Sequence, residues 1–372
     1  MRVMVTGANG FIGKNLLMHF CEKGDFEVVP FTREHSEQNL PQLLEGVDWV
    51  VHLAGINRPK DPAEFQTGNA DLTQALCDAV EQTDRQIPIV YTSSIQVDRG
   101  NDYGNSKQGA EDSLLALNEK TDNPVYIYRL PNVFGKWARP NYNSAVATFC
   151  HNIARGLPVQ INDPDAVVNL VYVDDLITSF LSLIETGDQN GPFVEVEPTY
   201  QILVGEMADQ LHRFKATRDN LVTEPVGKGL VRALYSTYVS YLPPKSFTYK
   251  VPQHGDERGV FVEMLKTQDS GQFSFFTAHP GVTRGGHYHH SKTEKFLVIK
   301  GEAGFRFRHI LTGEFYELFT SGESPEIVET VPGWTHDITN VGGTELVCML
   351  WANEMFDREN PDTYACPMGT KA

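Results

Sequence analysis

Two groups of residues in this sequence have types and spacings that support chemistry, and the first is a glycine-rich run. It reads TGANGFIG, from Thr6 to Gly13. The run follows a short β-rich segment and leads into a helical one, so its glycines allow a tight turn and a close backbone approach to a pyrophosphate. We therefore expect a dinucleotide cofactor to contact this set of residues: Gly7, Asn9, Gly10, Phe11, Ile12 and Gly13.

The end of the second predicted strand bears on the choice between NAD and NADP. An acidic residue about 20 positions after the glycines would bind a ribose 2′-hydroxyl, but the residues there are Phe31, Thr32 and Arg33. A cationic side chain favours a 2′-phosphate, so Arg33 predicts NADPH as the cofactor. The alternative is that Arg33 is a solvated surface arginine.

A tyrosine and a lysine four positions apart predict proton transfer. Tyr103 and Lys107 would lie one turn apart on the same face of a helix. There the lysine can lower the pKa of the phenol, which then exchanges a proton with an alcohol or ketone oxygen while hydride moves at the nicotinamide. Ser94, at the end of a predicted strand, would hydrogen-bond the same oxygen. The alternative is an ordinary tyrosine beside a lysine on a helix surface, which the glycine-rich run makes less favourable.

The second group of residues is rich in histidine. It comprises HYHHSKTE, from His287 to Glu294, and a later PGWTH that ends at His336. Residues two apart on a strand face the same way, so His287 and His289 can converge inside a barrel. With Glu294 and His336 they form a set of three imidazoles and one carboxylate. Such ligands suit Zn, Fe, Ni or Mn, and we expect one divalent metal, with zinc as the first choice.

The elements that must position these residues follow from the period of the apolar positions. Short β-rich runs alternate with helical stretches in the first part of the chain, which predicts a parallel α/β sheet. The expected strands are Arg2 to Thr6, Glu27 to Phe31, Trp49 to Leu53, Ile89 to Thr92 and Val125 to Tyr128, and the expected helices include Asn69 to Gln82 and Lys107 to Asn118.

The alternation of strand and helix patterns ends at Pro243-Pro244, which predicts a second domain. Short strands with Gly, Pro and Thr turns follow it, which is typical of a small β-barrel or jelly roll. A length of 372 residues also suggests two domains. We therefore predict an NADP-binding reductase domain at 1–243 and a β-barrel domain at 244–372.

Composition limits the partners. The formal charge of -17 and the pI near 5.1 argue against nucleic acid or an anionic membrane as a general partner. The five cysteines are scattered and have no CxxC spacing, which indicates reduced thiols in a reducing cytoplasm. No apolar stretch approaches the ~20 residues of a membrane span, and no secretory leader is visible. We expect a cytoplasmic protein.

The first 240 or so residues resemble an extended short-chain dehydrogenase/reductase of the nucleotide-sugar type, with a Rossmann-type doubly wound sheet. The resemblance implies that Leu53, Ala54, Gly55 and Lys107 contact the cofactor and that Asn132 helps to hold a sugar nucleotide. The matching positions are Gly7, Gly10, Gly13, His52 to Gly55, Asn69, Ser93, Ser94, Tyr103, Lys107, Arg129 to Gly135 and Val173 to Asp175.

Two departures from this family concern the catalytic serine. Ser94 lies only nine residues before Tyr103, closer than is usual in the family, and Val97 to Arg99 replaces the common VYG. The loop between them must be shortened. Ser93 is therefore an alternative to Ser94.

The histidine-rich group resembles the two motifs of the cupin family. The first reads HxHxxxxExxxxxxG and ends at Gly301, while in the second Glu326 replaces the usual opening glycine. The segments from His254 to Glu263 and from Gly281 to His287 also resemble the dTDP-4-keto-6-deoxyhexose 3,5-epimerases, which are cupins. We therefore expect an all-β cupin barrel with epimerase activity.

That epimerase resemblance gives His287 a second possible role. In those epimerases the matching histidine is the base that removes a proton beside a ketone, so His287 is predicted to be a ligand, a base or both. Arg258 and Arg284 would pair with a diphosphate. The alternatives are ordinary arginines at the barrel edge and a metal with only a structural role. The opposing general acid cannot be identified from the sequence.

Taken whole, the chain resembles the CapF-type bifunctional enzymes of bacterial capsule and O-antigen synthesis. The resemblance implies a UDP-2-acetamido-2,6-dideoxy-L-4-hexulose, epimerised at C3 by the cupin and reduced at C4 with NADPH. The product would be UDP-2-acetamido-2,6-dideoxy-L-talose, on the route to UDP-N-acetyl-L-fucosamine. The alternatives are a dTDP-6-deoxy-4-hexulose substrate and a non-catalytic sensor that binds NADP and a sugar nucleotide. A homodimer is expected by analogy.

Overall fold

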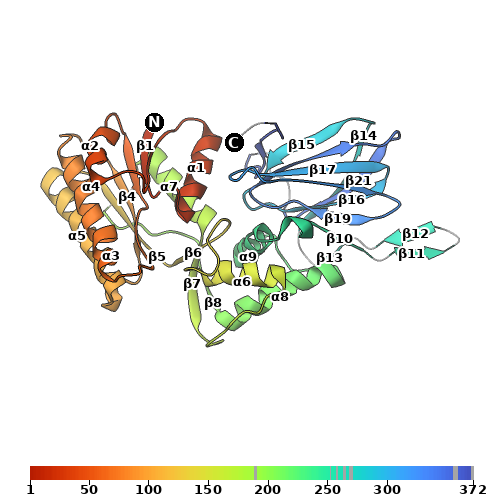
Figure 1. Cartoon of the computed structure of the whole chain (residues 1–372), viewed down its shortest axis with the longest axis horizontal. Coiled ribbons are helices and arrows are strands. Elements are labelled where there is room, and N and C mark those ends of the chain that lie inside the picture. Colours follow the sequence, from red (N-terminus) through yellow and green to blue (C-terminus); the bar gives the residue numbers. More distant parts are fainter. Residues whose placement is uncertain are drawn as a thin grey trace. The chain divides into compact units, whose positions relative to one another are not determined.

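The computed structural model describes residues 1–187, 191–251, 253–256, 259–262, 265–267, 271–354 and 359–369. The chain forms two compact units (Figure 1). The first unit comprises Met1–Ser144 and Val168–Gln201, and the second comprises Ala145–Val167 and Ile202–Ala372. No helix among the described residues is long and apolar enough to cross a membrane.

A parallel five-stranded sheet, in the order β2-β1-β3-β4-β5, forms the centre of the first unit. Its strands are β1 (Arg2–Thr6), β2 (Glu27–Phe31), β3 (Trp49–His52), β4 (Ile89–Ser94) and β5 (Val125–Leu130). The helices are α1 (Phe11–Lys23), α2 (Leu40–Leu43), α3 (Ala63–Phe65), α4 (Leu72–Glu81), α5 (Asp102–Thr121) and α7 (Val173–Thr186), with short turns η1 (Glu37–Asn39), η2 (Gln66–Asp71) and η3 (Val97–Arg99).

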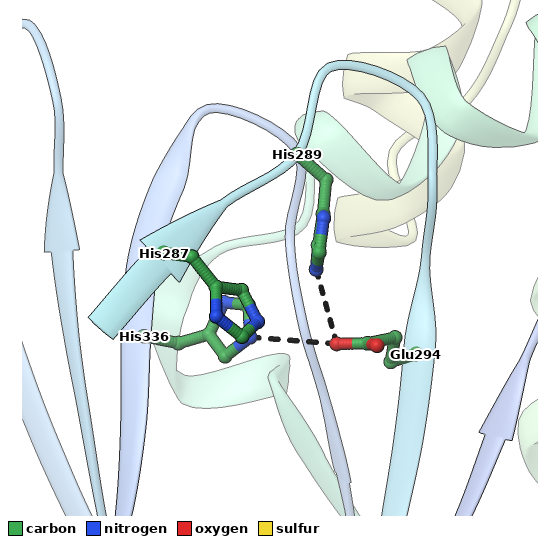
Figure 2. A group of neighbouring side chains, drawn as sticks. All are labelled: His287, His289, Glu294 and His336. Carbon is green, nitrogen blue, oxygen red and sulfur yellow. Dashed lines mark hydrogen bonds and ion pairs between the residues drawn. The ribbon is translucent and has the colours of Figure 1, made fainter. Parts of the chain in front are cut away.

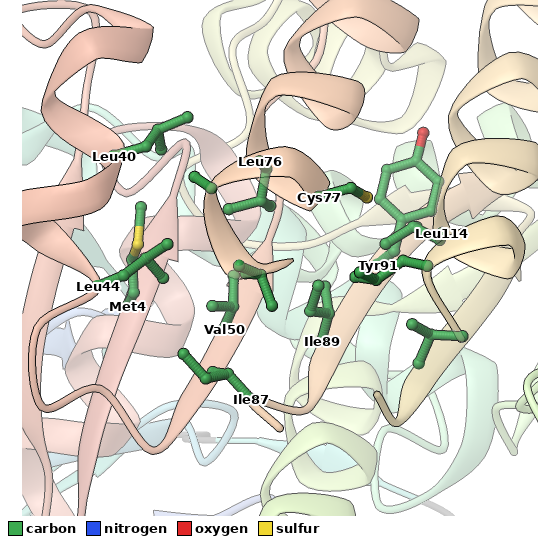
Figure 3. Close-up of a cluster of buried hydrophobic side chains, with 14 of the residues drawn as sticks. Met4, Leu40, Leu44, Val50, Leu76, Cys77, Ile87, Ile89, Tyr91 and Leu114 are labelled. Carbon is green, nitrogen blue, oxygen red and sulfur yellow. The ribbon is translucent and has the colours of Figure 1, made fainter. Parts of the chain in front are cut away.

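The core of the first unit lies between this sheet and helices α2, α4 and α5. Figure 3 shows Val50 and Ile89 of the sheet beside Leu76 of α4 and Leu114 of α5, and all four side chains are fully buried. A sheet covered on both faces reads as continuous apolar runs, and α1 and α7 pack against each other as further cover. The predicted α/β fold with a parallel doubly wound sheet is thus confirmed.

Two predicted helices differ in their bounds from the observed ones. The helix expected from Lys107 begins earlier, at Asp102, because the Asn101 side chain caps it by accepting from Gly104 N at 2.7 Å. The helix expected from Asn69 is regular only from Leu72, and a π-helical turn, η2, precedes it. A further three-stranded sheet completes the unit, with β6 (Asn132–Phe134), β7 (Val167–Tyr172) and β8 (Thr199–Leu203).

Among the described residues, the second unit combines three α-helices with two five-stranded antiparallel sheets and two two-stranded pairs. The sheet orders are β10-β19-β16-β21-β14 and β18-β17-β20-β15-β22, which confirms the predicted all-β, cupin-like architecture after the α/β part. The helices are α6 (Ala145–Arg155), α8 (Val204–Asn220) and α9 (Gly229–Ser240), followed by the turn η4 (Pro244–Ser246).

The strands of the second unit are β9 (Val222–Thr223), β10 (Thr248–Lys250), β11 (Gln253–Asp256), β12 (Gly259–Val262), β13 (Lys266–Thr267), β14 (Gln272–Ala278), β15 (Thr283–Tyr288), β16 (Glu294–Lys300), β17 (Glu302–His309), β18 (Phe315–Ser321), β19 (Glu326–Glu329), β20 (Trp334–Asn340), β21 (Leu346–Ala352) and β22 (Tyr364–Ala365). On β17 the burial of the side chains alternates between the two faces of the sheet from Phe305 on. On β17, Phe305 and Phe307 are buried while Arg306 and Arg308 are half-exposed. The domain boundary after residue 243 stays a prediction, since the compact units group the helices α6, α8 and α9 with the β-strands.

A buried ion cluster joins these helices to the sheet. Glu329 of β19 pairs with Lys295 of β16 and with Arg218 of α8, and it accepts a hydrogen bond from Tyr235 of α9 at 3.1 Å. Burial raises the pKa of the Glu329 carboxyl, but Lys295 and Arg218 more than offset this and lower it. Glu329 therefore holds its charge and balances two cations.

We expect Glu329→Gln to destabilise the second unit by roughly 3–5 kcal/mol, because it leaves the Lys295 ammonium buried without a counter-charge. The measurement is urea unfolding followed by the fluorescence of Trp334 and Trp351, which lie in this unit. Glu326→Gln, at a half-buried position on the same strand, is the control. Equal stabilities of the two variants would contradict the role of the cluster.

Candidate active site and metal centre

The glycine-rich turn leaves no room for side chains at two of its glycines. Gly7 has a φ of +66°, and a Cβ on it would lie 2.8 Å from Ala54 N. A Cβ on Gly13 would lie 2.5 Å from Gly7 O, so α1 starts directly against the turn. No side chain caps α1 at Gly10. The N–H groups of Phe11 and Ile12 are thus placed at a helix N-terminus that is suited to a phosphate.

Thr6 holds the predicted cofactor loop at Leu53 and Ala54, and the sequence reasoning missed it. Its Oγ1 accepts hydrogen bonds from Leu53 N at 3.1 Å and Ala54 N at 3.0 Å, and it lies 2.6 Å from His52 Nδ1. Burial and the charge of Lys107 lower the pKa of His52 to about 3, so this imidazole is neutral. The sequence signal that could have identified this role is a threonine at the end of the first strand.

Gly55 lies where two functional side chains approach the backbone. A Cβ there would be 2.8 Å from Asn69 Oδ1 and 3.4 Å from Lys107 Nζ. Asn69 accepts from Ile56 N at 2.8 Å and donates to Ile56 O and Ser106 Oγ, each at 2.9 Å. The π-helical turn η2 carries Asn69 to this position, as such turns often do at functional sites. The structure thus brings together Gly55, Lys107 and Asn69, while the contacts of Gly55 and Lys107 with a cofactor stay predictions.

The two candidate serines at the end of β4 have different partners. Ser93 donates to the carboxylate of Glu111, which is fully buried and also binds Arg129 in a bidentate pair, at 3.1 Å and 2.6 Å. Ser94 Oγ accepts from Gln96 N at 3.2 Å, and Ser94 lies close enough to Tyr103 to influence the pKa of its phenol. Ser94 is therefore the serine beside the tyrosine, while Ser93 is held by Glu111.

The short spacing from Ser94 to Tyr103 is accommodated by a compact turn. The connection contains η3, and a Cβ on Gly104 would overlap the carbonyl oxygen of Gln96, so α5 starts directly against the end of this turn. Burial raises the pKa of the Tyr103 phenol, and the hydrogen bond with Ser94 lowers it in part. The sequence predicted that Lys107 lowers the pKa of Tyr103, but the net shift of this pKa is upward. A protonated phenol is the form that donates a proton to a ketone oxygen.

Lys107 is buried one turn along α5 from Tyr103. Its Nζ donates to Thr92 O at 2.8 Å and lies 4.7 Å from the centre of the Tyr91 ring. Burial lowers the pKa of Lys107 to about 8, although Glu111 acts to raise it. The ammonium is thus largely charged at neutral pH and close to its titration range.

Three further predicted ligand contacts involve Arg33, Asn132 and Arg258. Arg33 is exposed just after β2, and Asn132 is exposed on β6, where it donates to Asn169 O at 3.0 Å. Their roles toward a 2′-phosphate and a sugar nucleotide stay predictions. Arg258 lies outside the described residues.

The predicted metal ligands converge in the second unit. The ligand atoms of His287, His289, Glu294 and His336 all lie within 4.8 Å of one another. Figure 2 shows them pointing toward one another from β15, β16, β20 and the turn after β15. Glu294 Oε2 lies 3.0 Å from His289 Nε2 and 3.4 Å from His336 Nε2. The sequence spacing alone had indicated this set.

The charges of this cluster fit a divalent cation. Burial and the neighbouring histidines lower the pKa of His287 to about 3, so its imidazole is neutral, as both a ligand and a base require. Burial would raise the pKa of Glu294, but His289 and His336 hold it well below its usual range. Both ring nitrogens of His336 are buried without a hydrogen bond of ordinary geometry to the described residues. A set of three nitrogens and one carboxylate oxygen suits zinc and related metals.

Arg284 shares the inner face of its sheet with buried residues. It stands opposite Ile338 in the pairing of β15 with β20, and Ile338 stands opposite Phe305 of β17. Its guanidinium lies 5.5 Å from the ring centre of Phe276, which contacts Phe296, and Phe296 contacts His336. These aromatic contacts connect Arg284, which is exposed, to His336. Arg284 therefore lies on the face of the sheet that carries the histidines.

Two protein families match the sequence. The NAD dependent epimerase/dehydratase family covers residues 3–196, and the Polysaccharide biosynthesis C-terminal domain covers residues 254–364. The chain is 64% identical over 372 residues to UDP-2-acetamido-2,6-beta-L-arabino-hexul-4-ose reductase of Pseudomonas aeruginosa, covering 100% of both chains.

Solved structures are similar over different lengths. The capsular polysaccharide assembling protein CapF from Staphylococcus aureus has a TM-score of 0.68 and 39% identity, covering 99% of this chain and 100% of that chain. UDP-glucuronic acid 4-epimerase from Bacillus cereus, in complex with NAD, has a TM-score of 0.53 and 21% identity, covering 58% and 83%. The second likeness concerns the fold alone.

We expect Ser94→Ala and Ser93→Ala to have different effects. Loss of Ser94 removes a donor beside the reacting oxygen, which lowers the turnover of a ketone by about 10²-fold or more and leaves cofactor affinity unchanged. Loss of Ser93 takes a donor from buried Glu111, which costs about 1–3 kcal/mol of stability. Steady-state kinetics and thermal unfolding of both variants provide the comparison. A larger loss of turnover in Ser93→Ala would reverse the assignment.

Proposed function

Since the chain belongs to the NAD dependent epimerase/dehydratase family, we propose that it converts a UDP-linked 4-keto sugar in two steps, C3 epimerisation and then C4 reduction. Its similarity to CapF-type enzymes, predicted from the sequence, is confirmed over nearly the full length. The arrangement of Ser94, Tyr103 and Lys107 beside Gly55 carries the proposal. Sequence identity of 64% to a UDP-hexulose reductase supports the substrate class.

The reduction needs one hydride and one proton. A bound nicotinamide would supply the hydride for the C4 carbon of the sugar, and Tyr103 would give its phenolic proton to the carbonyl oxygen, so that the ketone becomes a secondary alcohol. Ser94 would hold that oxygen, and the Lys107 ammonium, on the same helix α5 as Tyr103, would stabilise the phenolate left on it. We assign NADPH as the donor because Arg33 follows β2 where an acidic residue would favour NAD.

The epimerisation is assigned to the second unit. His287, His289, Glu294 and His336 would hold one divalent metal, for which zinc is the first choice, and a bound metal would polarise the C4 carbonyl and make the C3 proton more acidic. His287 is neutral and half-buried, so it is suited to accept that proton or to bind the metal. Arg284, and Arg258 by its sequence match, would pair with the diphosphate.

The chemistry fixes the order of the two steps. A proton on C3 is acidic only while C4 is a ketone, and the reduction removes that ketone. Epimerisation must therefore come first, and reduction makes the new configuration permanent. The product we assign is UDP-2-acetamido-2,6-dideoxy-L-talose, a precursor of UDP-N-acetyl-L-fucosamine. The homodimer and the cytoplasmic location stay predictions.

We expect UDP-2-acetamido-2,6-dideoxy-4-hexulose in D₂O to take up deuterium at C3 with the enzyme alone. Addition of NADPH should then give a single 4-hydroxy sugar, and NMR follows both events. Tyr103→Phe should keep the exchange and lose the reduction, because only the phenolic proton donor is removed. His287→Gln should lose the exchange, because His287 is either the base or a ligand, and should keep NADPH binding.

Three other outcomes would point elsewhere. Exchange and reduction only with a dTDP-4-keto-6-deoxy sugar would favour the alternative nucleotide. Binding of NADPH and sugar nucleotide without turnover of either substrate would favour a sensor. Exchange that persists unchanged in His287→Gln would remove the second unit from the epimerisation.

The pH dependence of the reduction should follow Lys107. The lysine is charged below its pKa of about 8 and loses its proton as the pH rises through that value, so kcat should fall on the alkaline side. Glu111 acts to raise this pKa, and Glu111→Gln should move the fall to lower pH. Steady-state kinetics at saturating NADPH test both statements. A kcat that stays constant well above pH 8 would contradict them.

A further inference from the structure

The turn between β15 and β16 carries the predicted metal ligand His289 and leads into Glu294. The side-chain carboxylate of Asp362 binds the backbone of this turn. Asp362 Oδ2 accepts from Ser291 N at 2.7 Å and from Lys292 N at 2.6 Å, and Oδ1 accepts from His290 N at 2.8 Å. Oδ2 also accepts from Ser291 Oγ at 3.0 Å. One side chain thus satisfies three successive backbone N–H groups of the turn.

The backbone of Asp362 contacts the ligand itself. Its carbonyl oxygen lies 2.5 Å from His289 Nδ1. A carbonyl oxygen only accepts, so Nδ1 carries the proton and donates it. The other ring nitrogen, Nε2, lies 3.0 Å from Glu294 Oε2, and with the proton on Nδ1 it is the nitrogen that can offer a lone pair to a metal.

The next residue acts on a second ligand through a lysine. Thr363 Oγ1 accepts from Lys292 Nζ at 3.2 Å, and the same Nζ lies 3.4 Å from Glu294 Oε1. This contact turns Oε1 toward the lysine and leaves Oε2 toward His289 and His336. Lys292 is itself buried, so water does not replace these contacts.

The rest of the segment lies along the ligand strand. Ala365 pairs with His287 in the β15–β22 ladder, and Cys366 N donates to Gly286 O at 2.7 Å. Thr335, next to the ligand His336, donates to Cys366 O at 2.5 Å. Residues 362–366 therefore lie beside all four ligands or their immediate neighbours.

We propose that residues 362–366 are the outer shell of the metal site, with Asp362 as the positioning residue that sets metal affinity. The proposal rests on the metal site of the proposed function. The segment orients His289 through a carbonyl and Glu294 through Lys292, so its docking and metal binding must favour each other. By linkage, the effect is reciprocal.

The turn has other contacts that keep it folded when Asp362 changes. Asn353 Oδ1 accepts from Thr293 N at 3.0 Å, and Ser236 of α9 donates to Ser291 O at 2.5 Å. A loss of metal affinity on substitution of Asp362 would therefore report ligand orientation rather than loss of the turn.

The test is Zn²⁺ affinity of the full chain, measured by competition with a chromophoric chelator. Asp362→Asn keeps the size of the side chain but has one acceptor oxygen, and we expect its Zn²⁺ affinity to fall by about 10- to 100-fold. Asp337→Asn is the matched control. Asp337 is likewise a carboxylate, buried and paired with Arg306 at 2.6 Å, and it adjoins the predicted ligand His336 but lies on the other face of β20. Its Zn²⁺ affinity should equal that of the wild type.

A second measurement uses the wild-type chain. Zn²⁺ should slow amide hydrogen exchange in the peptide that contains residues 362–366, as linkage requires, and mass spectrometry detects this even if Asp362→Asn does not fold. Equal Zn²⁺ affinities of Asp362→Asn and Asp337→Asn, or unchanged exchange on Zn²⁺ addition, would overturn the proposal while leaving the metal site intact. Absence of Zn²⁺ binding by the wild type would instead remove the metal site and this proposal together.

Discussion

A buried ammonium group determines how the first site is built. Lys107 carries its charge inside the protein, where an ion without partners costs several kcal/mol. Helix α5 must therefore lie where Nζ reaches Thr92 O and the face of the Tyr91 ring. That position places Tyr103, one turn earlier, against Ser94. The reacting phenol is thus located by a charge that is not itself the proton donor.

A comparable constraint acts on β16 in the second unit. Two neighbouring residues of this strand, Glu294 and Lys295, are charged and buried, and they face opposite sides. Glu294 faces His289, whereas Lys295 pairs with Glu329. A shift of the strand by one residue would exchange the two faces and separate both charges from their partners. The ion cluster that joins the helices to the sheet therefore also fixes the register of Glu294, a predicted metal ligand.

Sequence patterns predicted what depends on local spacing. The glycine-rich turn, the strands of the parallel sheet and the convergence of His287 with His289 follow from chain periods of two and 3.6 residues. Contacts between distant positions were not predictable in this way. Ser93 is held away from Tyr103 by Glu111 of α5, and Glu111 pairs in turn with Arg129 of β5. Asp362 reaches the histidine turn from about 70 residues further along the chain, and no motif marks it.

Burial keeps one predicted catalytic group uncharged in each unit, with opposite consequences for proton transfer. A low dielectric disfavours the charged form of any group, so it lowers the pKa of an imidazole and raises that of a phenol. In the second unit this keeps His287 neutral, with a lone pair for a proton or a metal. In the first unit it keeps Tyr103 protonated, with a proton to give. In the proposed reactions, the same effect would favour removal of a proton in the cupin-like unit and donation of one in the first unit.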